Sequence, residues 1–592
     1  CLGEHGRQQE NRQRADYIEK KPLHFIRHSN SHYFVDFGKA AFATLKIRLT
    51  LLQDGDSTII FLGERKTDHN LVHKKPGLSN IGFKRIAIPL KAGTHEYQVE
   101  LPRHISHYPN SQVLADHMPE VAPFRYAEIV NTPTPITAAD VRQLALYYYF
   151  DDDASFFTSS NSNLNQVWEL CKYTLKATPF LSLYADGNRE RMPYEADAYI
   201  QQLGHYCVDR EYSVARYTNQ FLIFNPSWPT EWHLHTVLMA WHDFLYTGNN
   251  ESIKIYYDEL AKKTHIGLAA DNGLISTRTG LATKEYLANI HFHGNNFSDI
   301  VDWPPGTPAG ERQARNAGPF PEGERDGYVF TTFNTVVNAL HYKTLVIMAH
   351  MAAELGKSAD AEFYQKRALQ VKNSFNEVFL DRKRGIYVDG DETDHASLHA
   401  NMFPLALGLV PEEHIDSVIA FIKSRGMACG VYGAQYLLDA LFNVGESEYA
   451  LQLMTSESRR SWMNMIRVGS TMTTEAWDEF FKPNLTWNHA WGAAPANIIP
   501  RRMFGIQPLV PGWEKTLVKP QLGDVETAEL RVPTIRGPME AKWHNRGDAL
   551  HFALVIPANM IAEVWLPTDD EMNISENGLA IADHDFIHTL ER

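Results

Sequence analysis

The sequence predicts a multidomain protein, with a central all-α domain flanked by an N-terminal and a C-terminal β-sandwich domain. At 592 residues the chain is longer than one hydrophobic core usually supports. Hydrophobic residues make up 44% and charged residues 21% of the chain, which is typical of a folded protein. Apolar residues alternate near both ends of the chain and recur at helical spacing between them. The order β, α, β follows from this change of period.

The first part of the chain is expected to hold a polar tether and a β-sandwich. Residues 1–29 are mostly polar or charged, so we predict a tether there. From Tyr33 onward short alternating stretches follow one another, with Asp54-Gly55 as a turn between two of them. Further strands are expected near residues 82–90, 95–101 and 124–130. Together they predict an N-terminal β-sandwich over residues 30–148.

Residues 149–505 are expected to form the helical domain. Twelve segments have apolar residues at helical spacing: 162–178, 196–209, 213–225, 234–249, 251–270, 331–357, 358–381, 395–410, 412–426, 433–446, 447–458 and 487–505. Consecutive helices joined by short hairpins can close into an (α/α)6 barrel of six inner and six outer helices. An α-solenoid is the alternative, but the chain has no sequence repeat of fixed length.

Three long loops interrupt the helical domain, at residues 179–195, 271–330 and 459–486. Loops of this length in a compact domain are usually functional, so we expect all three to meet at one mouth of the barrel.

After Gly505 alternating stretches return at residues 516–519, 528–532, 539–543, 550–556 and 561–566. They predict a C-terminal β-sandwich over residues 506–592.

Charge and cysteine content restrict the partners and the compartment. The net charge of −15 disfavours nucleic acid and anionic membranes as partners. Cys171, Cys207 and Cys429 fall in helical segments without paired spacing, so we expect buried free thiols and no metal site or other cofactor. Cys1, followed by polar residues, is typical of a mature lipid-anchored bacterial lipoprotein, which would be exported to the periplasm or the outer membrane. An arbitrary start of the sequence is the alternative.

Two acidic loops are the candidates for catalysis. The stretch Asp186 to Asp197 combines acids and arginines with Pro193 and Tyr194, and it leads into a helix. In the 459–486 loop, Glu475 lies among threonines and next to Trp477. Glycoside hydrolysis needs two carboxyl groups, one protonated as general acid and one ionised as nucleophile or base. The two loops can supply them.

Several motifs of the chain resemble those of one enzyme family. They are Arg189-Glu190-Arg191 with Tyr194 and Asp197, Glu475 in its threonine-rich stretch, Asn488-His489-Ala490-Trp491-Gly492, Asp302-Trp303, Phe504-Gly505-Ile506, Pro511-Gly512-Trp513 and Val518-Lys519-Pro520. Together with the β, α, β order they resemble glycoside hydrolase family 78, the α-L-rhamnosidases of bacteria. The resemblance covers nearly the whole chain.

The resemblance implies a role for each site residue. Glu190 would be the general acid and Glu475 the general base of an inverting hydrolase, which needs its carboxyl groups roughly 6.5–9.5 Å apart. The remaining matches imply substrate-binding residues, which are Asp186, Tyr194, Asp197, Trp303 and His489. The predicted activity is removal of a terminal α-L-rhamnose from a polysaccharide-derived oligosaccharide.

The stretch around the acid departs from the family pattern. It reads Asp186-Gly187-Asn188 where the family has Asp-Cys-Pro, and Pro-Tyr-Glu-Ala where the family has Gly-Trp-Thr-Gly. The sugar bound here can therefore be a decorated rhamnose or one with an acidic neighbour.

Alternatives stay open at this point. His489 could be a core histidine, and Trp303 could serve only loop packing. Other helical-barrel enzymes hydrolyse glucosidic linkages or cleave uronic ones, and Tyr194 with His489 could form the pair of a lyase. A glycan-binding protein without activity would keep the aromatic residues but would not need both carboxylates.

Overall fold

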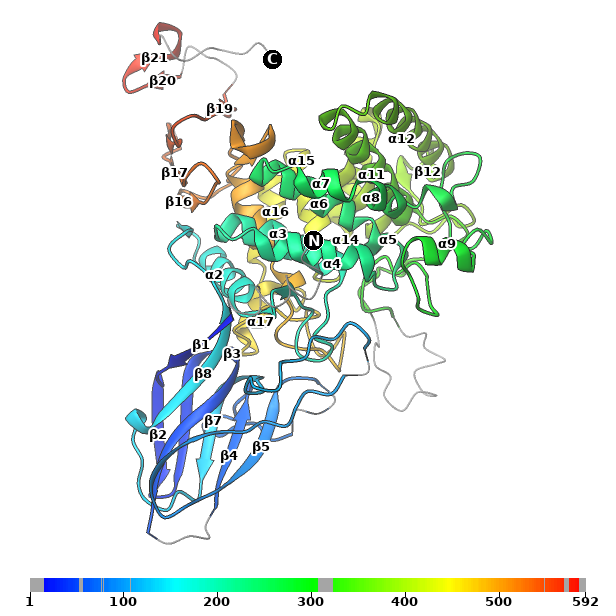
Figure 1. Cartoon of the computed structure of the whole chain (residues 1–592). Coiled ribbons are helices and arrows are strands. Elements are labelled where there is room, and N and C mark those ends of the chain that lie inside the picture. Colours follow the sequence, from blue (N-terminus) through cyan, green and yellow to red (C-terminus); the bar gives the residue numbers. More distant parts are fainter. Residues whose placement is uncertain are drawn as a thin grey trace.

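A computed structural model describes residues 15–52, 57–75, 77, 79–106, 108–306, 323–547, 549–568 and 574–584. Figure 1 shows the N-terminal strands in blue at the bottom, the helices above them, and the C-terminal strands to one side of the helices. The multidomain order of β, α and β elements is as predicted. Cys1 and its predicted lipid anchor lie outside the described residues. In the described part of the chain, no helix is both long and apolar enough to cross a membrane.

The N-terminal domain is one eight-stranded antiparallel sheet built around a very long strand, β3. Its strands are β1 (Ala15–Lys20), β2 (His24–Ser29), β3 (His32–Leu51), β4 (Ser57–Gly63), β5 (Phe83–Pro89), β6 (Gly93–Gln98), β7 (Ala122–Val130) and β8 (Val141–Tyr148). The first part of β3 pairs with β2 and β7, and its last part pairs with β6 and β8. All eight strands are therefore joined by hydrogen bonds into one sheet, where the predicted sandwich would have two.

The predicted tether over residues 1–29 is wrong for residues 15–29, which form β1 and β2. Strand β1 pairs along its whole length with β8, and β2 pairs with the start of β3. The side chains of β2 are mostly exposed, so its composition is polar although its backbone is hydrogen-bonded. The core of the domain takes alternate residues of β3, from Tyr33 to Leu51, and packs them against β4, β7 and β8.

The helical domain contains most of the predicted helices within a few residues of their predicted bounds. Its helices are α2 (Ser162–Ala177), α3 (Glu195–Val208), α4 (Ser213–Phe224), α5 (Thr230–His233), α6 (His235–Thr247), α7 (Glu251–Ile255), α8 (Tyr257–Lys263), α9 (Lys284–Asn289), α11 (Thr335–Glu354), α12 (Ser358–Val378), α13 (Leu398–Leu407), α14 (Ile415–Arg425), α15 (Gly433–Asn443), α16 (Ser447–Thr455), α17 (Trp462–Arg467) and α18 (Pro495–Ile498). Short two-stranded hairpins, β10 (Pro179–Phe180) with β11 (Leu183–Tyr184) and β12 (Leu380–Asp381) with β13 (Ile386–Tyr387), lie between them.

Two predicted helices are wrong in part. The segment 251–270 is divided at Tyr256 into α7 and α8. The segment 487–505 has only a short 3-10 turn at Ala490–Gly492 before Pro495, where α18 begins and runs into a π-helical turn at Ile499–Met503. Its first residues instead bond to the 459–486 loop, since the backbone N–H of His489 donates to the carbonyl of Thr473 at 2.9 Å. This bond to a distant residue takes the place of the hydrogen bonds that an α-helix would make there.

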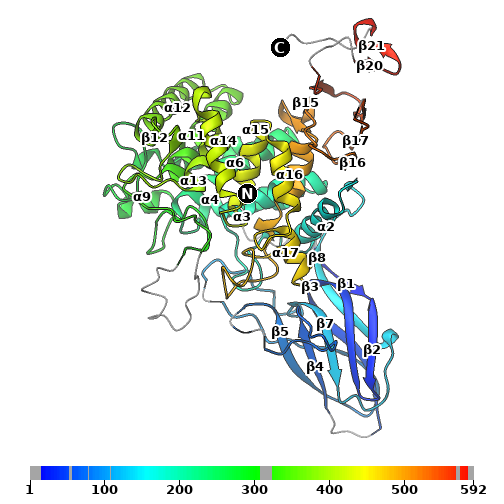
Figure 2. The ribbon, with the colours of Figure 1, turned by 180° about the vertical axis from the view of Figure 1, so that it is seen from behind.

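The helices form two sets that differ in burial. Helix α3 is buried along its whole length, and α13 and α15 nearly so. Along this inner set, α3 contacts α6, α6 contacts α11, α11 contacts α13, α13 contacts α15, α15 contacts α18, and α18 returns to α3. Outer helices bury one stripe; α12 buries Ala361, Tyr364, Ala368, Val371 and Phe375, three or four residues apart. Figure 2 shows α13 to α16 from behind.

The C-terminal part contains two small sheets, close to the predicted strands. One joins β14 (Gln507–Pro508), β15 (Lys515–Val518) and β19 (Ile561–Val564); the other joins β18 (Leu550–Val555), β17 (Met539–Asn545), β16 (Thr527–Val532) and β9 (Phe156–Ser159). A last hairpin consists of β20 (Ser575–Glu576) and β21 (Leu579–Ala580). Strand β9 lies inside the predicted helical domain, so the C-terminal sheet also uses chain from before the helices.

The three long loops meet, as predicted, and two of them touch the N-terminal domain. Arg460 donates to the carbonyl of Gly323 at 3.2 Å, which joins the 459–486 loop to the 271–330 loop. Figure 1 shows blue and yellow loops crossing at the junction of the two domains. There the backbone N–H of Asn80 donates to Leu485 at 2.9 Å, and Met472 is buried in the N-terminal core. The N-terminal domain is thus packed directly against the loops that carry the candidate site.

Candidate active site

The loop between β11 and α3, residues 185–194, carries Glu190 and is called the acid loop below. Two backbone hydrogen bonds within the loop hold its shape. The N–H of Asp186 donates to Met192 at 2.9 Å, and the N–H of Arg191 donates to Gly187 at 3.0 Å. Gly187 has a φ of 103°, a conformation that side chains other than glycine rarely adopt. A methyl group there would also lie 2.7 Å from the carbonyl oxygen of Asn488. The sequence Asp186-Gly187 is therefore needed for the tight turn that presents Glu190.

The second candidate, Glu475, is fixed by backbone hydrogen bonds within its own loop, residues 459–486. Its N–H donates to the carbonyl of Thr486 at 3.1 Å, and the N–H of Thr486 donates back to its side-chain Oε2 at 3.1 Å. The indole N–H of Trp491 donates to the Glu475 carbonyl at 3.0 Å. Only 2% of Glu475 is exposed. A carboxylate held in this way keeps one orientation.

Arg189 joins the two glutamates. Its Nη2 lies 2.9 Å from Oε1 of Glu190 and 2.7 Å from Oε1 of Glu475, and its Nη1 lies 3.2 Å from Oε2 of Glu475. The loops at residues 179–195 and 459–486 thus bring both predicted catalytic residues together. Oε1 of Glu190 and Oε1 of Glu475 thus lie on either side of one nitrogen. The guanidinium lies between the two carboxylates, and the separation of roughly 6.5–9.5 Å stays a prediction for the sugar-bound state.

Two cations determine the charge of Glu475. Burial alone would raise its pKa, but Arg189 and Lys482 lower that pKa from the ordinary 4.5 to about 2. Lys482 Nζ lies 3.1 Å from Oε1, and its side chain is 1% exposed. Glu475 is therefore ionised at every pH at which the protein is expected to work, as a general base must be.

Glu190 has protonated neighbours on its other side. The hydroxyl of Tyr194 donates to its Oε2 at 2.5 Å. Burial, and then the charge of Glu190, raise the pKa of Asp186 well above the ordinary value. Burial also raises the pKa of Tyr194. The carboxyl group of Asp186 therefore favours its protonated form more than an ordinary aspartate does.

Asp197 and His489 form the third side of the site. Asp197 lies on the first turn of α3, and its Oδ1 is 2.8 Å from Nε2 of His489. Neither Oδ2 of Asp197 nor Nδ1 of His489 has a hydrogen-bond partner among the described residues, and both atoms are buried. They are the kind of groups that bind sugar hydroxyls. The ring of Trp491 packs on His489, with centroids 4.7 Å apart.

Two family descriptions match most of the chain. Residues 152–503 match the family described as bacterial alpha-L-rhamnosidase 6 hairpin glycosidase domain. That match spans more than half of the chain. The chain belongs to this family. Residues 505–580 also match the bacterial alpha-L-rhamnosidase C-terminal domain.

Individual relatives of this rhamnosidase family are distant and longer. An alpha-L-rhamnosidase of Alteromonas sp. (strain LOR) is 24% identical over 69% of this chain and 44% of its own length. One from Formosa agariphila is 23% identical over 76% of this chain and 48% of its own. The chain thus spans about half the length of these relatives.

Solved rhamnosidase structures have a similar fold. The alpha-L-rhamnosidase from Dictyoglumus thermophilum matches with a TM-score of 0.73 at 19% identity, over 94% of this chain and 59% of that one. The Streptomyces avermitilis alpha-L-rhamnosidase complexed with L-rhamnose matches with a TM-score of 0.71 at 16% identity, over 95% and 52%. At these identities the likeness concerns the fold.

Trp303, the last of the predicted rhamnosidase residues, lies on the third loop. Its N–H donates to Oδ1 of Asp302 at 2.7 Å, and the guanidinium of Arg325 lies 5.9 Å from its ring centre. Oδ2 of Asp302 accepts from the N–H of Gly430 at 2.7 Å. These contacts place Trp303 beside the inner helices, and its part in sugar binding stays a prediction.

Sequence reasoning missed several members of the candidate site. Arg189 directly precedes the acid, but the sequence does not predict its contact with Glu475, and Lys482 stands between Phe481 and Pro483 without any motif. Trp232 was also missed; its ring lies 5.4 Å from that of Tyr194 and 6.1 Å from that of Trp491. No local pattern marks these residues, because their contacts join segments far apart in the chain.

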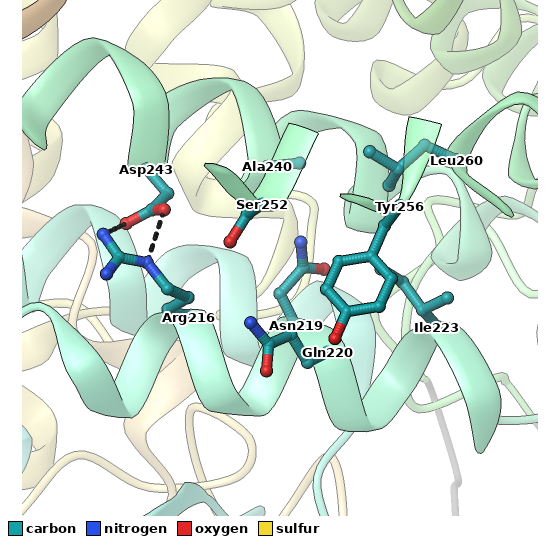
Figure 3. A pocket seen from close by; sticks show the side chains of 9 residues that line it. All are labelled: Arg216, Asn219, Gln220, Ile223, Ala240, Asp243, Ser252, Tyr256 and Leu260. Carbon is teal, nitrogen blue, oxygen red and sulfur yellow. Dashed lines mark hydrogen bonds and ion pairs between the residues drawn. The ribbon is translucent and has the colours of Figure 1, made fainter. Parts of the chain in front are cut away.

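A separate hollow between α4, α6 and α8 does not fit the chemistry of a glycosidase (Figure 3). It is lined by Arg216, Asn219, Gln220, Ile223, Ala240, Asp243, Ser252, Tyr256 and Leu260. Its acid, Asp243, accepts from Arg216 at 2.9 and 3.1 Å and from Tyr206 at 2.9 Å. Asp243 is the single acid among the lining residues, and both of its carboxylate oxygens accept hydrogen bonds. This hollow therefore offers no pair of carboxyl groups for catalysis.

Proposed function

We propose that the protein is an inverting α-L-rhamnosidase that removes a terminal α-L-rhamnose from a polysaccharide-derived oligosaccharide. The observation that carries the proposal is the meeting of two buried glutamates from two loops in opposite surroundings. Glu475 is paired with two cations, Arg189 and Lys482, whereas Glu190 shares only Arg189 and has the hydroxyl of Tyr194 on its other oxygen. Glycoside hydrolysis requires this asymmetry.

We also propose that the helical domain closes as an (α/α)6 barrel. The closed order of contacts α3, α6, α11, α13, α15, α18 and back to α3 supports six inner helices. The family description as a six-hairpin domain is consistent with it. In such a barrel the loops at one end surround the axis, which agrees with the meeting of the three long loops.

The proposed reaction uses the two carboxyl groups in opposite roles. Glu190 donates its proton to the glycosidic oxygen as the bond between that oxygen and the anomeric carbon breaks. Glu475 accepts a proton from a water molecule whose oxygen attacks the anomeric carbon from the opposite face. The products are rhamnose with an inverted anomeric centre and the shortened glycan. A proton moves from Glu190 to the leaving group and another from water to Glu475, so the charges balance.

The arginine bridge has to open for this reaction. Arg189 is the most exposed member of the cluster, with 23% of its side chain accessible, while the side chains of Glu190 and Glu475 are 9% and 2% exposed. We propose that the incoming rhamnose displaces Arg189 from Glu190, while Arg189 and Lys482 keep Glu475 ionised. Asp186, Asp197 and His489 then bind the sugar hydroxyls, with Tyr194 and Trp303 as its aromatic borders.

Glutamine substitutions test the proposal. Glu190→Gln and Glu475→Gln keep the shape of each side chain and remove its acid–base capacity. Each should lower kcat on a rhamnose-terminated oligosaccharide by at least about 10²–10⁴-fold. Nitrophenyl α-L-rhamnoside, whose leaving group needs little protonation, should partly restore the activity of Glu190→Gln but not that of Glu475→Gln. The reverse pattern, or near-normal activity of Glu475→Gln, would contradict the assignment.

A further inference from the structure

A segment of the N-terminal domain, residues 108–121, lies directly against the acid loop. The N–H of Gln112 donates to the carbonyl of Arg191 at 2.7 Å. The guanidinium of Arg191 donates to the carbonyl of Val121 at 2.7 Å and pairs with the carboxylate of Glu120 at 2.7 Å. Three bonds thus attach this segment to the residue that directly follows Glu190.

The Glu120–Arg191 pair is well placed to fix the orientation of the Glu190 side chain. Both side chains are 3% exposed. Arg191 has a φ of 51°, a left-handed conformation that is unusual for arginine. Such a conformation persists only where the surroundings fix it, and here the contacts with Glu120, Val121 and Gln112 add to those within the loop. Removal of the pair would free the backbone beside the catalytic acid.

Tyr108 is the residue that this segment presents to the site. Unlike the buried site residues, 42% of Tyr108 is exposed. Burial is the first cause of its raised pKa, and the charge of Glu190 and hydrogen bonding to Glu190 are the next. Tyr108 lies four residues before Gln112, whose N–H bonds to Arg191 beside the acid, and part of its side chain faces solvent. Asn110, two residues on, reaches Asn225 at the end of α4 at 3.5 Å.

We propose that the N-terminal domain builds the leaving-group side of the active site: Tyr108 contacts the sugar next to the rhamnose, and Glu120 is a positioning residue for Glu190. This inference rests on the proposed function. The general acid protonates the oxygen between the rhamnose and its neighbouring sugar, so a group beside Glu190 that is open to solvent meets that neighbour. An exposed tyrosine ring can stack on a pyranose face, and its hydroxyl can bond to a sugar hydroxyl.

A pair of substrates tests the role of Tyr108. α-L-Rhamnosyl fluoride has no neighbouring sugar, and its leaving group needs little protonation. A rhamnose-terminated oligosaccharide has a neighbouring sugar, and its leaving group must be protonated. Tyr108→Ala should lower kcat/KM on the oligosaccharide by about tenfold, the size expected for the loss of one aromatic contact. It should leave hydrolysis of the fluoride within about twofold. Tyr149→Ala, at another exposed tyrosine of the N-terminal part, is the matched control and should change neither.

The outcomes separate this inference from the proposed function. If the wild-type protein hydrolyses neither substrate, the proposed function fails. If the wild-type protein is active and Tyr108→Ala affects both substrates equally, or neither, the role of Tyr108 is refuted while the function stands.

Glu120→Gln tests the positioning role. It should lower kcat on the oligosaccharide at least tenfold more than kcat on the fluoride, because only the oligosaccharide depends on a correctly directed acid. A purely structural role would lower both activities in proportion, together with the melting temperature, and would overturn the positioning role. Should Glu120→Gln fail to fold, Tyr108→Ala, a change at an exposed residue, still decides the central proposal.

Discussion

Lys482 offers a quantitative test of how Glu475 stays ionised. The change Lys482→Met removes a cation 3.1 Å from the carboxylate and leaves Arg189 at 2.7 Å. A cation at this range lowers a carboxyl pKa by about 1–3 pH units. Because one pH unit corresponds to 1.36 kcal/mol, the lost interaction is about 1.4–4 kcal/mol. The pKa of Glu475 should rise from about 2 toward about 3–5.

The pH dependence of kcat/KM measures this change. A base must be ionised, so activity is lost as the pH falls through its pKa. With nitrophenyl α-L-rhamnoside and reactions stopped in alkali, the wild-type protein should stay active down to about pH 3, whereas Lys482→Met should lose activity between about pH 5 and 3. Lys515→Met, at a surface pair with Glu563 in the C-terminal part, is the control. An unchanged acid limb in Lys482→Met would refute the electrostatic account.

The same shift predicts a stability effect. The folded-state pKa of Glu475 lies below the ordinary 4.5, so the unfolded chain binds more protons between pH 4.5 and 2. Its contribution to stability is present above about pH 4.5 and is lost as the pH falls toward 2. In Lys482→Met this pH-dependent contribution should be smaller, which melting curves between pH 3 and 6 would show.

Two further predictions concern the acid loop and its support. Gly187→Ala should lower kcat/KM by at least about tenfold, because its methyl group would lie 2.7 Å from the Asn488 carbonyl in a backbone conformation that alanine rarely adopts; wild-type kinetics would contradict this. Glu64, which accepts hydrogen bonds from Gly82 at 2.6 Å and Asn488 at 3.2 Å, has its pKa raised by burial to about 7. The folded protein therefore binds more protons than the unfolded chain between about pH 4.5 and 7, and its stability falls as the pH rises through that range. The melting temperature of Glu64→Gln relative to wild type should thus increase from pH 5 to pH 7.5, and a constant difference would disprove it.

Most of the fold could be predicted from local periodicity. Helix α12 places its buried residues three or four apart, and β3 alternates from Leu45 to Leu51, so both are visible in the sequence. Strands β1 and β2 were missed because they are polar, and only pairing with β8 and β3 makes them strands. The start of the last predicted helix was wrong because His489 bonds to Thr473, which no local pattern reveals.

The sequence predicts which carboxylates gather in the candidate site, but it does not predict the cations that are paired with them. Glu190, Glu475, Asp197 and His489 do come together in space. Their partners depend on contacts between distant segments, such as Arg189 with a glutamate 286 residues away. The separation of the two glutamates could not be predicted either, since it depends on where the Arg189 guanidinium lies.

The anomeric form of the first sugar released tests the central claim most directly. Proton NMR can follow the hydrolysis of an α-L-rhamnoside before the product equilibrates. An acid at Glu190 and a base at Glu475, separated by Arg189 until the sugar binds, predict β-L-rhamnose as the first product. Initial release of α-L-rhamnose would show retention. It would mean that the two carboxyl groups act at the short distance at which the arginine holds them, with Glu475 as nucleophile instead of base.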